Sequence, residues 1–308
     1  MCSHPERVIQ RGIRPAMLVS VSTSRVIDAH RSAGSAFTSG GVESFVRREG
    51  DGAAVVCMHG LPASSFLYRR VLPELASRGL RGVAFDLPGL GLAARPDGFD
   101  YRVRGLGKWA AGALDTLGIE RYHLVLHDAG GPIGTEMALV DPGRVLSVTV
   151  LDTPLALSTM PFPGEVYAKV AHRMIGPMAS RDLWRRLMYR VGIDDRAAVP
   201  AVEVDAYRDL CLGDDGGKGY LDIMRVVRDE PVRTDAFRDV LDTRRVRHPV
   251  RILWGMGDPI LTVRHFGRIA LDVTGLPSLT TIPGRHFLQE DRAPQIAEFV
   301  AATAALAD

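Results

Sequence analysis

The stretch Leu124-Val125-Leu126-His127-Asp128-Ala129-Gly130-Gly131-Pro132 decides the fold of this chain. An apolar, β-branched run ends at one acidic residue, and two glycines and the start of a helical pattern follow it. A sharp turn between a strand and a helix strains the backbone of its central residue, and only glycine neighbours accommodate it sterically. The turn presents the side chain of Asp128 above the carboxyl end of a sheet, which is where a nucleophile belongs.

A carboxylate at this turn limits the reactions that the site can catalyse. It attacks an sp³ carbon that bears a leaving group and forms an alkyl–enzyme ester, whereas serine, the commoner residue here, attacks an acyl carbonyl. The alternative interpretation is structural, because Asp commonly caps the N-terminus of a following helix. The glycines beside Asp128 favour the catalytic interpretation.

Length and composition indicate one α/β core with an inserted segment. The chain has 308 residues, of which 46% are hydrophobic and 24% charged. A net charge of +2 without a block of like charges argues against nucleic acid or a membrane as a partner. The cysteines Cys2, Cys57 and Cys211 lack zinc or disulfide spacing. No apolar stretch is long enough to cross a bilayer and no signal-peptide core is present, so we expect a cytoplasmic location.

Short apolar runs alternate with helical patterns, which predicts a mostly parallel sheet covered on both faces. The expected strands are Val42–Arg47, Ala53–Met58, Gly82–Asp86, Tyr122–His127, Val145–Leu151, Val250–Trp254 and Leu279–Ile282. The expected helices are Phe66–Ser77, Val103–Leu117, Pro132–Val140 and Pro294–Leu306. The first 40 or so residues show weak periodicity, and we expect them to be partly loose.

The alternation stops between about Leu155 and Leu241. This part of the chain has aromatic residues and arginines in helix-like patterns without a clear strand, between the end of one strand and the start of the next. We therefore expect a helical cap at 155–241, inserted into a core that comprises 1–154 and 242–308.

Five motifs then occur in order. They are His59-Gly60-Leu61-Pro62, Asp86-Leu87-Pro88-Gly89-Leu90-Gly91, the turn at Asp128, Leu253-Trp254-Gly255-Met256-Gly257-Asp258-Pro259, and Gly284-Arg285-His286-Phe287-Leu288-Gln289-Glu290-Asp291. Nucleophile, acid and histidine follow the α/β-hydrolase order. Over about residues 42–302 the chain resembles the haloalkane dehalogenase and epoxide hydrolase branch of that superfamily, which has an Asp nucleophile. The resemblance implies a mostly parallel eight-stranded sheet flanked by helices, with an inserted helical cap.

The resemblance and the chemistry together assign roles. Asp128 forms the ester, and His286 takes a proton from the water that attacks it. Asp258 orients the imidazole, and the N–H groups of Leu61 and Ala129 form the oxyanion hole. Three alternatives stay open at this point. His286 can be a packed loop histidine and Asp258 a turn residue, while Asp152 competes for the acid role because some dehalogenases place the acid after that strand.

The leaving group separates two activities. A dehalogenase needs N–H donors for the departing halide, and in that family a Trp follows the nucleophile, where this chain has Ala129. The loop position is Leu61, which leaves Trp184 as the remaining indole candidate, unless it is a core residue. An epoxide hydrolase needs an acid for the ring oxygen, and Tyr167 and Tyr220 are the candidates, unless they are packing residues.

We therefore expect a hydrolase that opens epoxides of a bulky hydrophobic small molecule through an ester on Asp128. Haloalkane dehalogenation is the alternative, and a non-hydrolytic cyclase, lyase or ligand receptor on the same fold is the further alternative. We expect no cofactor, no metal site, no nucleic-acid or membrane partner, and a monomer or homodimer.

Overall fold

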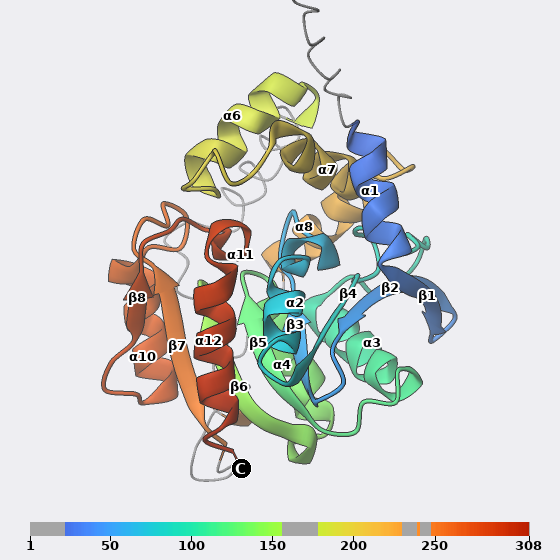
Figure 1. Ribbon diagram of the computed structural model, residues 1–308. Helices are drawn as coiled ribbons and strands as arrows, with labels where there is room; N and C mark the ends of the chain where they lie inside the picture. The colour runs from blue at the N-terminus through green and yellow to red at the C-terminus, as the bar shows by residue number, and fades with distance from the viewer. Residues whose placement is uncertain (1–21, 156–177, 230–238, 241–247, 308) are drawn as a thin grey trace, which may run out of the picture.

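The computed structural model describes residues 22–155, 178–229, 239–240 and 248–307, and an eight-stranded sheet lies at its centre (Figure 1). The strands are β1 Gly34–Ser39, β2 Val42–Glu49, β3 Ala53–Met58, β4 Leu80–Phe85, β5 Tyr122–His127, β6 Val145–Leu151, β7 Val250–Gly255 and β8 Thr280–Ile282. Their order is β1-β2-β4-β3-β5-β6-β7-β8. The pairs β1–β2 and β2–β4 are antiparallel and every other pair is parallel, which confirms the expected mostly parallel sheet.

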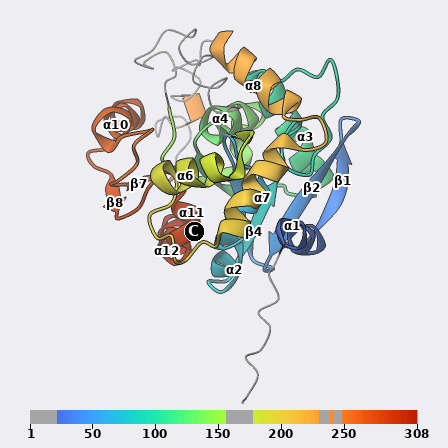
Figure 2. The same ribbon diagram turned by 90° about the horizontal axis from the view of Figure 1, so that it is seen from above.

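Helices cover both faces of the sheet. Those outside the insertion are α1 Thr23–Ser32, α2 Val71–Ala76, α3 Val103–Thr116, α4 Gly130–Val140, α10 Arg268–Thr274, α11 Leu288–Asp291 and α12 Ala293–Ala304. Shorter turns of helix are η1 Ser65–Tyr68, η2 Pro142–Arg144 and the π-helical η4 Val263–Gly267. Seen from above, α2 and α12 lie on one side of the strands, and α3 and α4 on the other (Figure 2).

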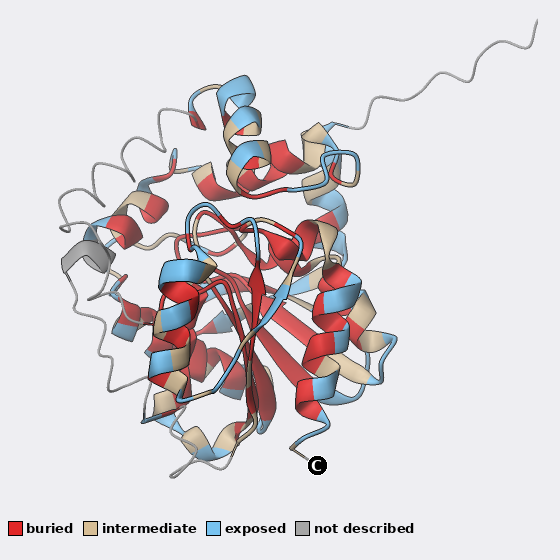
Figure 3. Cartoon of the chain, turned by 90° about the vertical axis from the view of Figure 1, so that its left-hand side faces the viewer, coloured by how far each residue is buried: buried red, intermediate tan, exposed pale blue. Residues whose placement is uncertain are grey.

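The core follows from the sequence pattern. Every residue of β5 is buried, and so are five of the six residues of β3, because both strands are covered by helices on both faces. Figure 3 shows the buried residues gathered in the central strands and on the inward sides of the helices. The expected bounds of β3, β5 and β6 are confirmed to the residue.

The expectation of a partly loose N-terminal segment is wrong for residues 23–39, which form α1 and β1. Gly40 and Gly41, with φ of +55° and +77°, connect β1 to β2 as a two-residue hairpin turn. His30 of α1 is buried, while most of the helix is exposed. The elements therefore depend on tertiary contacts rather than on strong local periodicity.

One expected helix, Phe66–Ser77, is instead two elements, η1 and α2. Pro73 has no N–H to donate to the carbonyl of Arg69, so one continuous helix cannot run through this point. The helix begins again at Val71, which places Pro73 in the first turn, where the missing N–H costs nothing.

Among the described residues between β6 and β7, in the region expected to form a cap, three helices are present. They are α6 Arg181–Val191, α7 Ala201–Leu212 and α8 Lys218–Asp229, and Figure 1 shows α6 and α7 above the carboxyl ends of the strands. Within the described ranges, no helix has the length and apolar character that crossing a membrane requires.

Alanine substitutions at two glycines of α3 would test how this helix packs. A Cβ on Gly112 would meet only Ser39 Oγ, at 3.4 Å, whereas one on Gly105 would lie 2.1 Å from the carbonyl oxygen of Asp100. We expect Gly112→Ala to raise the free energy of unfolding by about 0.5–1 kcal/mol, because alanine is the better helix former. Gly105→Ala should lower it by about 1–3 kcal/mol through overpacking. Denaturant titration of both variants measures this, and equal effects at the two sites would contradict the packing described.

Candidate active site

Asp128 occupies a strained turn between β5 and α4. Its φ is +49°, which is uncommon for a residue with a Cβ. The turn needs small neighbours, because a Cβ on Gly60 would lie 2.2 Å from Asp128 Oδ1 and one on Gly131 1.8 Å from Thr153 Oγ1. The amide of Asp128 donates to the carbonyl of Asp152 at the end of β6, and the Thr153 hydroxyl donates to the carbonyl of Asp128. The neighbouring strand therefore holds the turn in place.

Both oxygens of the Asp128 carboxylate have a defined environment. Oδ1 accepts the backbone N–H of Leu61 at 2.7 Å, and Oδ2 lies 3.5 Å from Nε2 of His286. The side chain is 15% exposed, so one part of it is accessible to a substrate.

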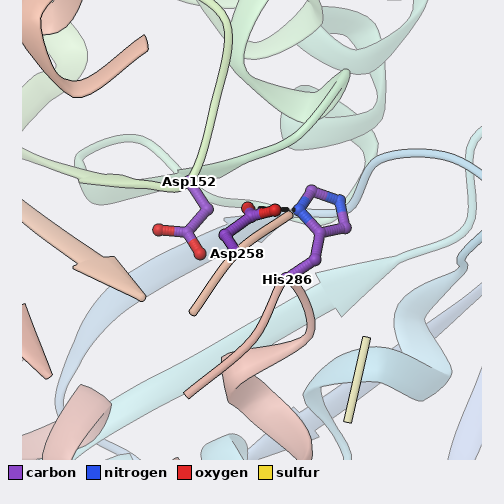
Figure 4. Close-up of side chains that lie close together, drawn as sticks. All are labelled: Asp152, Asp258 and His286. Atoms are coloured by element: carbon purple, nitrogen blue, oxygen red, sulfur yellow. Dashed lines mark hydrogen bonds and ion pairs between the residues drawn. The ribbon is translucent and has the colours of Figure 1, made fainter. Parts of the chain in front are cut away.

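His286 and Asp258 form a buried hydrogen-bonded pair (Figure 4). His286 Nδ1 donates to Asp258 Oδ2 at 2.8 Å. The other oxygen of Asp258 accepts the N–H groups of Ile260 and Leu261 at 2.7 and 2.9 Å. Asp258 follows β7, His286 follows β8 and Asp128 follows β5, so three parallel strands bring the groups together at one edge of the sheet.

Asp152, the other candidate for the acid, is close but is not hydrogen-bonded to His286 in this structure. It follows β6 with a φ of +30°, and its Oδ1 accepts the N–H of Gly255 at 2.9 Å. Figure 4 shows the dashed hydrogen bond of His286 running to Asp258, with Asp152 beyond it. The geometry therefore favours Asp258 over Asp152 as the partner of the imidazole.

The three groups shift one another's protonation. Burial alone would raise the pKa of Asp128, but its interactions with His286 lower it below the usual range. Burial likewise opposes ionisation of Asp258, and the charge and hydrogen bond of His286 lower its pKa. Burial would lower the pKa of His286, but the charge of Asp258 and the hydrogen bonds to both carboxylates raise it well above the ordinary value. The two carboxylates thus favour the protonated form of His286, and His286 favours their ionised forms.

Asp152 has the opposite shift. Burial and the neighbouring negative charge of Asp258 raise its pKa well above the usual value. Both effects favour the neutral form of Asp152, whereas those on Asp258 favour its ionised form.

Asp152, Asp258 and His286 offer ligand atoms within 4.8 Å of one another, which is close enough to hold a metal ion. The nitrogen of His286 that faces Asp258 donates a proton to it and so has no free lone pair for a metal. The arrangement fits an imidazole oriented by an acid better than a metal centre.

The loop after β3 carries the expected oxyanion-hole amide. The Leu61–Pro62 peptide bond is cis, and the Leu61 N–H already donates to Asp128. The amide nitrogen of Ala129 lies within 2.7 Å of the position of a Cβ on Gly60, so both amides border the same small space beside the carboxylate. His59 supports the loop, because its Nδ1 donates to the Gly60 carbonyl and its Nε2 accepts the N–H of Leu87.

The aromatic candidates have different positions. Trp184 is fully buried, and its indole N–H donates to the carbonyl of Val204 at 2.8 Å, so it joins α6 to α7 rather than facing Asp128 as a donor. Tyr220 is buried in the first turn of α8. The neighbouring Gly219 packs against the loop after β4, because a Cβ added to it would lie 2.6 Å from the carbonyl oxygen of Gly89. The loop of Gly89 follows β4, so Tyr220 lies close to the carboxyl ends of the strands. Tyr167 lies outside the described residues.

Sequence reasoning did not assign the contacts of three residues in and near the site. His127 Nε2 donates to the backbone carbonyl of His286 at 2.8 Å, and burial and the charge of His286 lower the pKa of His127 to about 4. Thr153 donates to the carbonyl of Asp128, and Glu290 lies in a buried ion cluster in the segment that follows His286. The position of Glu290, four residues after the histidine in a charged motif, was the one available signal.

Comparison with known proteins gives concordant similarities. The family model described as alpha/beta hydrolase fold matches residues 53–178. A haloalkane dehalogenase of Mycolicibacterium smegmatis is 30% identical over 268 residues, covering 82% of this chain and 85% of that protein. A fluoroacetate dehalogenase of a Burkholderia species is 40% identical over 107 residues, 33% of this chain and 35% of its own. A mutant epoxide hydrolase of Vigna radiata shares the fold, with a TM-score of 0.71, 18% identity and coverage of 89% and 98%.

Substitution of Asp258 and of Asp152 should affect the turnover rate differently. We expect Asp258→Asn to slow turnover on the order of 10⁴-fold, because the amide cannot orient or stabilise an imidazolium. Asp152→Asn should stay within about tenfold of the original rate, because an amide resembles a neutral carboxyl in shape and charge. Steady-state kinetics on a converted substrate measures both. A larger loss in Asp152→Asn than in Asp258→Asn would instead assign the acid role to Asp152.

The raised pKa of His286 gives a pH dependence with a defined sign. The stability that it contributes is present below the unfolded-state pKa of about 6.5 and is lost as pH rises through the higher folded-state pKa. We expect Asp128→Asn to lower the folded-state pKa of His286, because one of the charges that raise it is removed. NMR titration of ¹⁵N-labelled histidine measures this, with Glu43→Gln as an exposed control. An unchanged pKa would show that Asp128 does not interact with the imidazole.

Proposed function

This chain belongs to the α/β-hydrolase superfamily, in the family that contains the haloalkane dehalogenases, and from that premise we propose that it hydrolyses a small hydrophobic molecule through an ester on Asp128. The observation that carries the proposal is the position of His286, with Nε2 3.5 Å from Asp128 and Nδ1 2.8 Å from Asp258. In this position one imidazole can serve a carboxylate nucleophile and be oriented by a second acid.

The first half-reaction forms the ester. Oδ1 of Asp128 is held by the N–H of Leu61, which leaves Oδ2 to attack the sp³ carbon of the substrate. A carbon–oxygen bond forms to the enzyme, and the bond to the leaving group breaks with its electron pair. In an epoxide the pair goes to the ring oxygen, which takes a proton from an acid.

The second half-reaction hydrolyses the ester. His286 takes a proton from water as the water oxygen attacks the ester carbonyl, and the oxyanion that forms on Oδ1 accepts the N–H groups of Leu61 and Ala129. The intermediate collapses, the bond to the alkyl oxygen breaks, and the proton passes from His286 to that oxygen. The product alcohol leaves, and the new Asp128 carboxyl group loses the second proton of the water, which in an epoxide reaction replaces the one that the acid gave to the ring oxygen. The Asp128 carboxylate is thereby restored.

The charge of Asp128 links the two half-reactions. Asp128 as a carboxylate helps to raise the pKa of His286, and an ester has no charge. Ester formation therefore lowers the pKa of the imidazole when a base is needed to activate water. The retained charge of Asp258 stabilises the imidazolium that results.

The leaving group favours ring opening over halide release. All three tryptophans of the chain donate their indole N–H to backbone carbonyls, Trp109 to Ser39, Trp184 to Val204 and Trp254 to Leu261. No indole of this chain is therefore free to bind halide in this structure. We propose Tyr220 as the acid that protonates the ring oxygen, and α6–α8 as the cap that covers the substrate. The other candidate for the acid, Tyr167, lies outside the described residues.

Haloalkane dehalogenation is the second candidate, because relatives that match over 81% and 82% of the chain carry that name. Backbone amides beside Asp128 and a side chain outside the described residues would then have to bind the halide. A cyclase, lyase or receptor on the same fold would leave Asp128 unmodified.

Trapping the ester tests the proposal. We expect His286→Gln to accumulate a covalent adduct on Asp128 with a bulky aryl epoxide, because the nucleophile remains and the base is lost. Intact-protein mass spectrometry followed by peptide mapping detects it. In the wild-type enzyme, single turnover in ¹⁸O-water should place label in the Asp128 carboxylate.

Asp128→Asn is the control and should give neither adduct nor label. Product formation by the wild-type enzyme without label in Asp128 would overturn the ester mechanism. An adduct and halide release with bromoalkanes, and none with epoxides, would assign the chain to dehalogenation instead.

A further inference from the structure

A buried ion cluster joins an inserted helix to the segment that carries the base. Glu290 of α11 accepts two hydrogen bonds from the guanidinium of Arg69, at 2.5 and 2.8 Å, and one from the hydroxyl of Tyr207. Arg69 also pairs with Glu203. Tyr207 and Glu203 belong to α7, whereas Arg69 follows η1 in the core. The core, the inserted helices and the chain after His286 thus meet at one carboxylate.

The backbone of the base is itself bonded to an inserted helix. The N–H groups of His286 and Phe287 donate to the carbonyls of Val191 and Gly192, at 3.3 and 2.8 Å, where α6 ends. The ring of Phe287 stacks on Tyr207, with centroids 5.7 Å apart. Tyr207 therefore contacts both Glu290 and the residue next to the base.

The ion cluster can hold the segment that follows His286 in a fixed position relative to the core and α7. The Glu290 side chain is fully buried, and the Arg69 guanidinium, 9% exposed, lies 3.9 Å from the centre of the Phe66 ring. A bidentate arginine–carboxylate pair defines both distance and orientation. A buried charge that loses its partner is strongly disfavoured, so the pair resists separation.

We propose that Glu290, held by Arg69 and Tyr207, is a positioning residue that sets the distance between His286 and the ester on Asp128. The inference rests on the proposed function, because it assigns Glu290 to one of the two half-reactions. Asp128 is held by the hydrogen bonds from Leu61 and Thr153 and by the turn after β5, and Glu290 takes part in neither hydrogen bond. Ester formation should therefore be independent of Glu290, and ester hydrolysis should depend on it.

The experiment separates the two half-reactions in Glu290→Gln. With an aryl epoxide in single turnover, we expect ester hydrolysis to slow by about 10- to 100-fold, since small displacements of a catalytic group have effects of this size. Ester formation should change by less than about twofold. Tyr207→Phe, which keeps the ring and removes one hydrogen bond, should show the same pattern to a smaller degree and provides a test if Glu290→Gln does not fold.

Asp205→Asn is the matched control. Asp205 is also a buried carboxylate of α7 paired with arginines, but its partners are Arg181 and Arg185 of α6, away from the segment of the base. This variant should lose stability without accumulating ester. Equal slowing of both half-reactions in Glu290→Gln, or the same ester accumulation in Asp205→Asn, would overturn the positioning role.

Amide hydrogen exchange tests the positioning role without a substrate or catalytic turnover. We expect the amides of His286 and Phe287 to exchange faster in Glu290→Gln and Tyr207→Phe than in Asp205→Asn, because their bonds to the end of α6 lose support. Unchanged exchange would contradict the inference even if the enzyme used another reaction. Ester trapped in His286→Gln but not in Glu290→Gln or Tyr207→Phe would leave the proposed function intact and overturn the positioning role alone.

Discussion

The left-handed backbone at Asp128 is the constraint on which the site depends. A side chain at φ +49° is strained, and the strain persists only because the surrounding structure holds it. Glycine at 60 and 131 lets the loop after β3 and the end of β6 approach the turn, and hydrogen bonds from Leu61 and Thr153 secure it. The same contacts that stabilise the turn place an amide donor beside the carboxylate. The conformation of the turn and the position of this amide donor therefore depend on the same contacts.

Electrostatic coupling in a buried space gives the groups different protonation states. Three carboxyl groups lie around one imidazole, and their pKa values move apart because they cannot all be ionised at low cost. Asp128 and Asp258 keep their charge through His286, while Asp152, which lacks that hydrogen bond, has a raised pKa. The second acid thus lies beside the pair in an environment that favours its neutral form, and Asp258 is the carboxyl group that is hydrogen-bonded to the imidazole.

The inserted helices contribute to the site from the side opposite the sheet. His286 is bonded through its ring to Asp258 in the core, through its carbonyl to His127, and through its N–H to the end of α6. The ring of Trp184, a candidate for halide binding on sequence grounds, is instead part of the contact between α6 and α7. These helices therefore support the base as well as covering the carboxyl ends of the strands.

The sequence by itself determined the sheet class, the bounds of β3, β5 and β6, and the turn at Asp128. Continuous apolar strands and a glycine-flanked acid are local signals that hold in any tertiary context. Only the tertiary structure shows that Asp258, and not Asp152, is hydrogen-bonded to His286, because both follow strands that end at the same edge and their distances to His286 depend on how those strands pack. It also decided that α1 forms, since its buried residue His30 contacts Phe66 and Ser65, more than 30 residues away. The ion cluster of Glu290 could likewise not be predicted from the sequence, because Arg69 and Glu290 are 221 residues apart and no periodic pattern joins them.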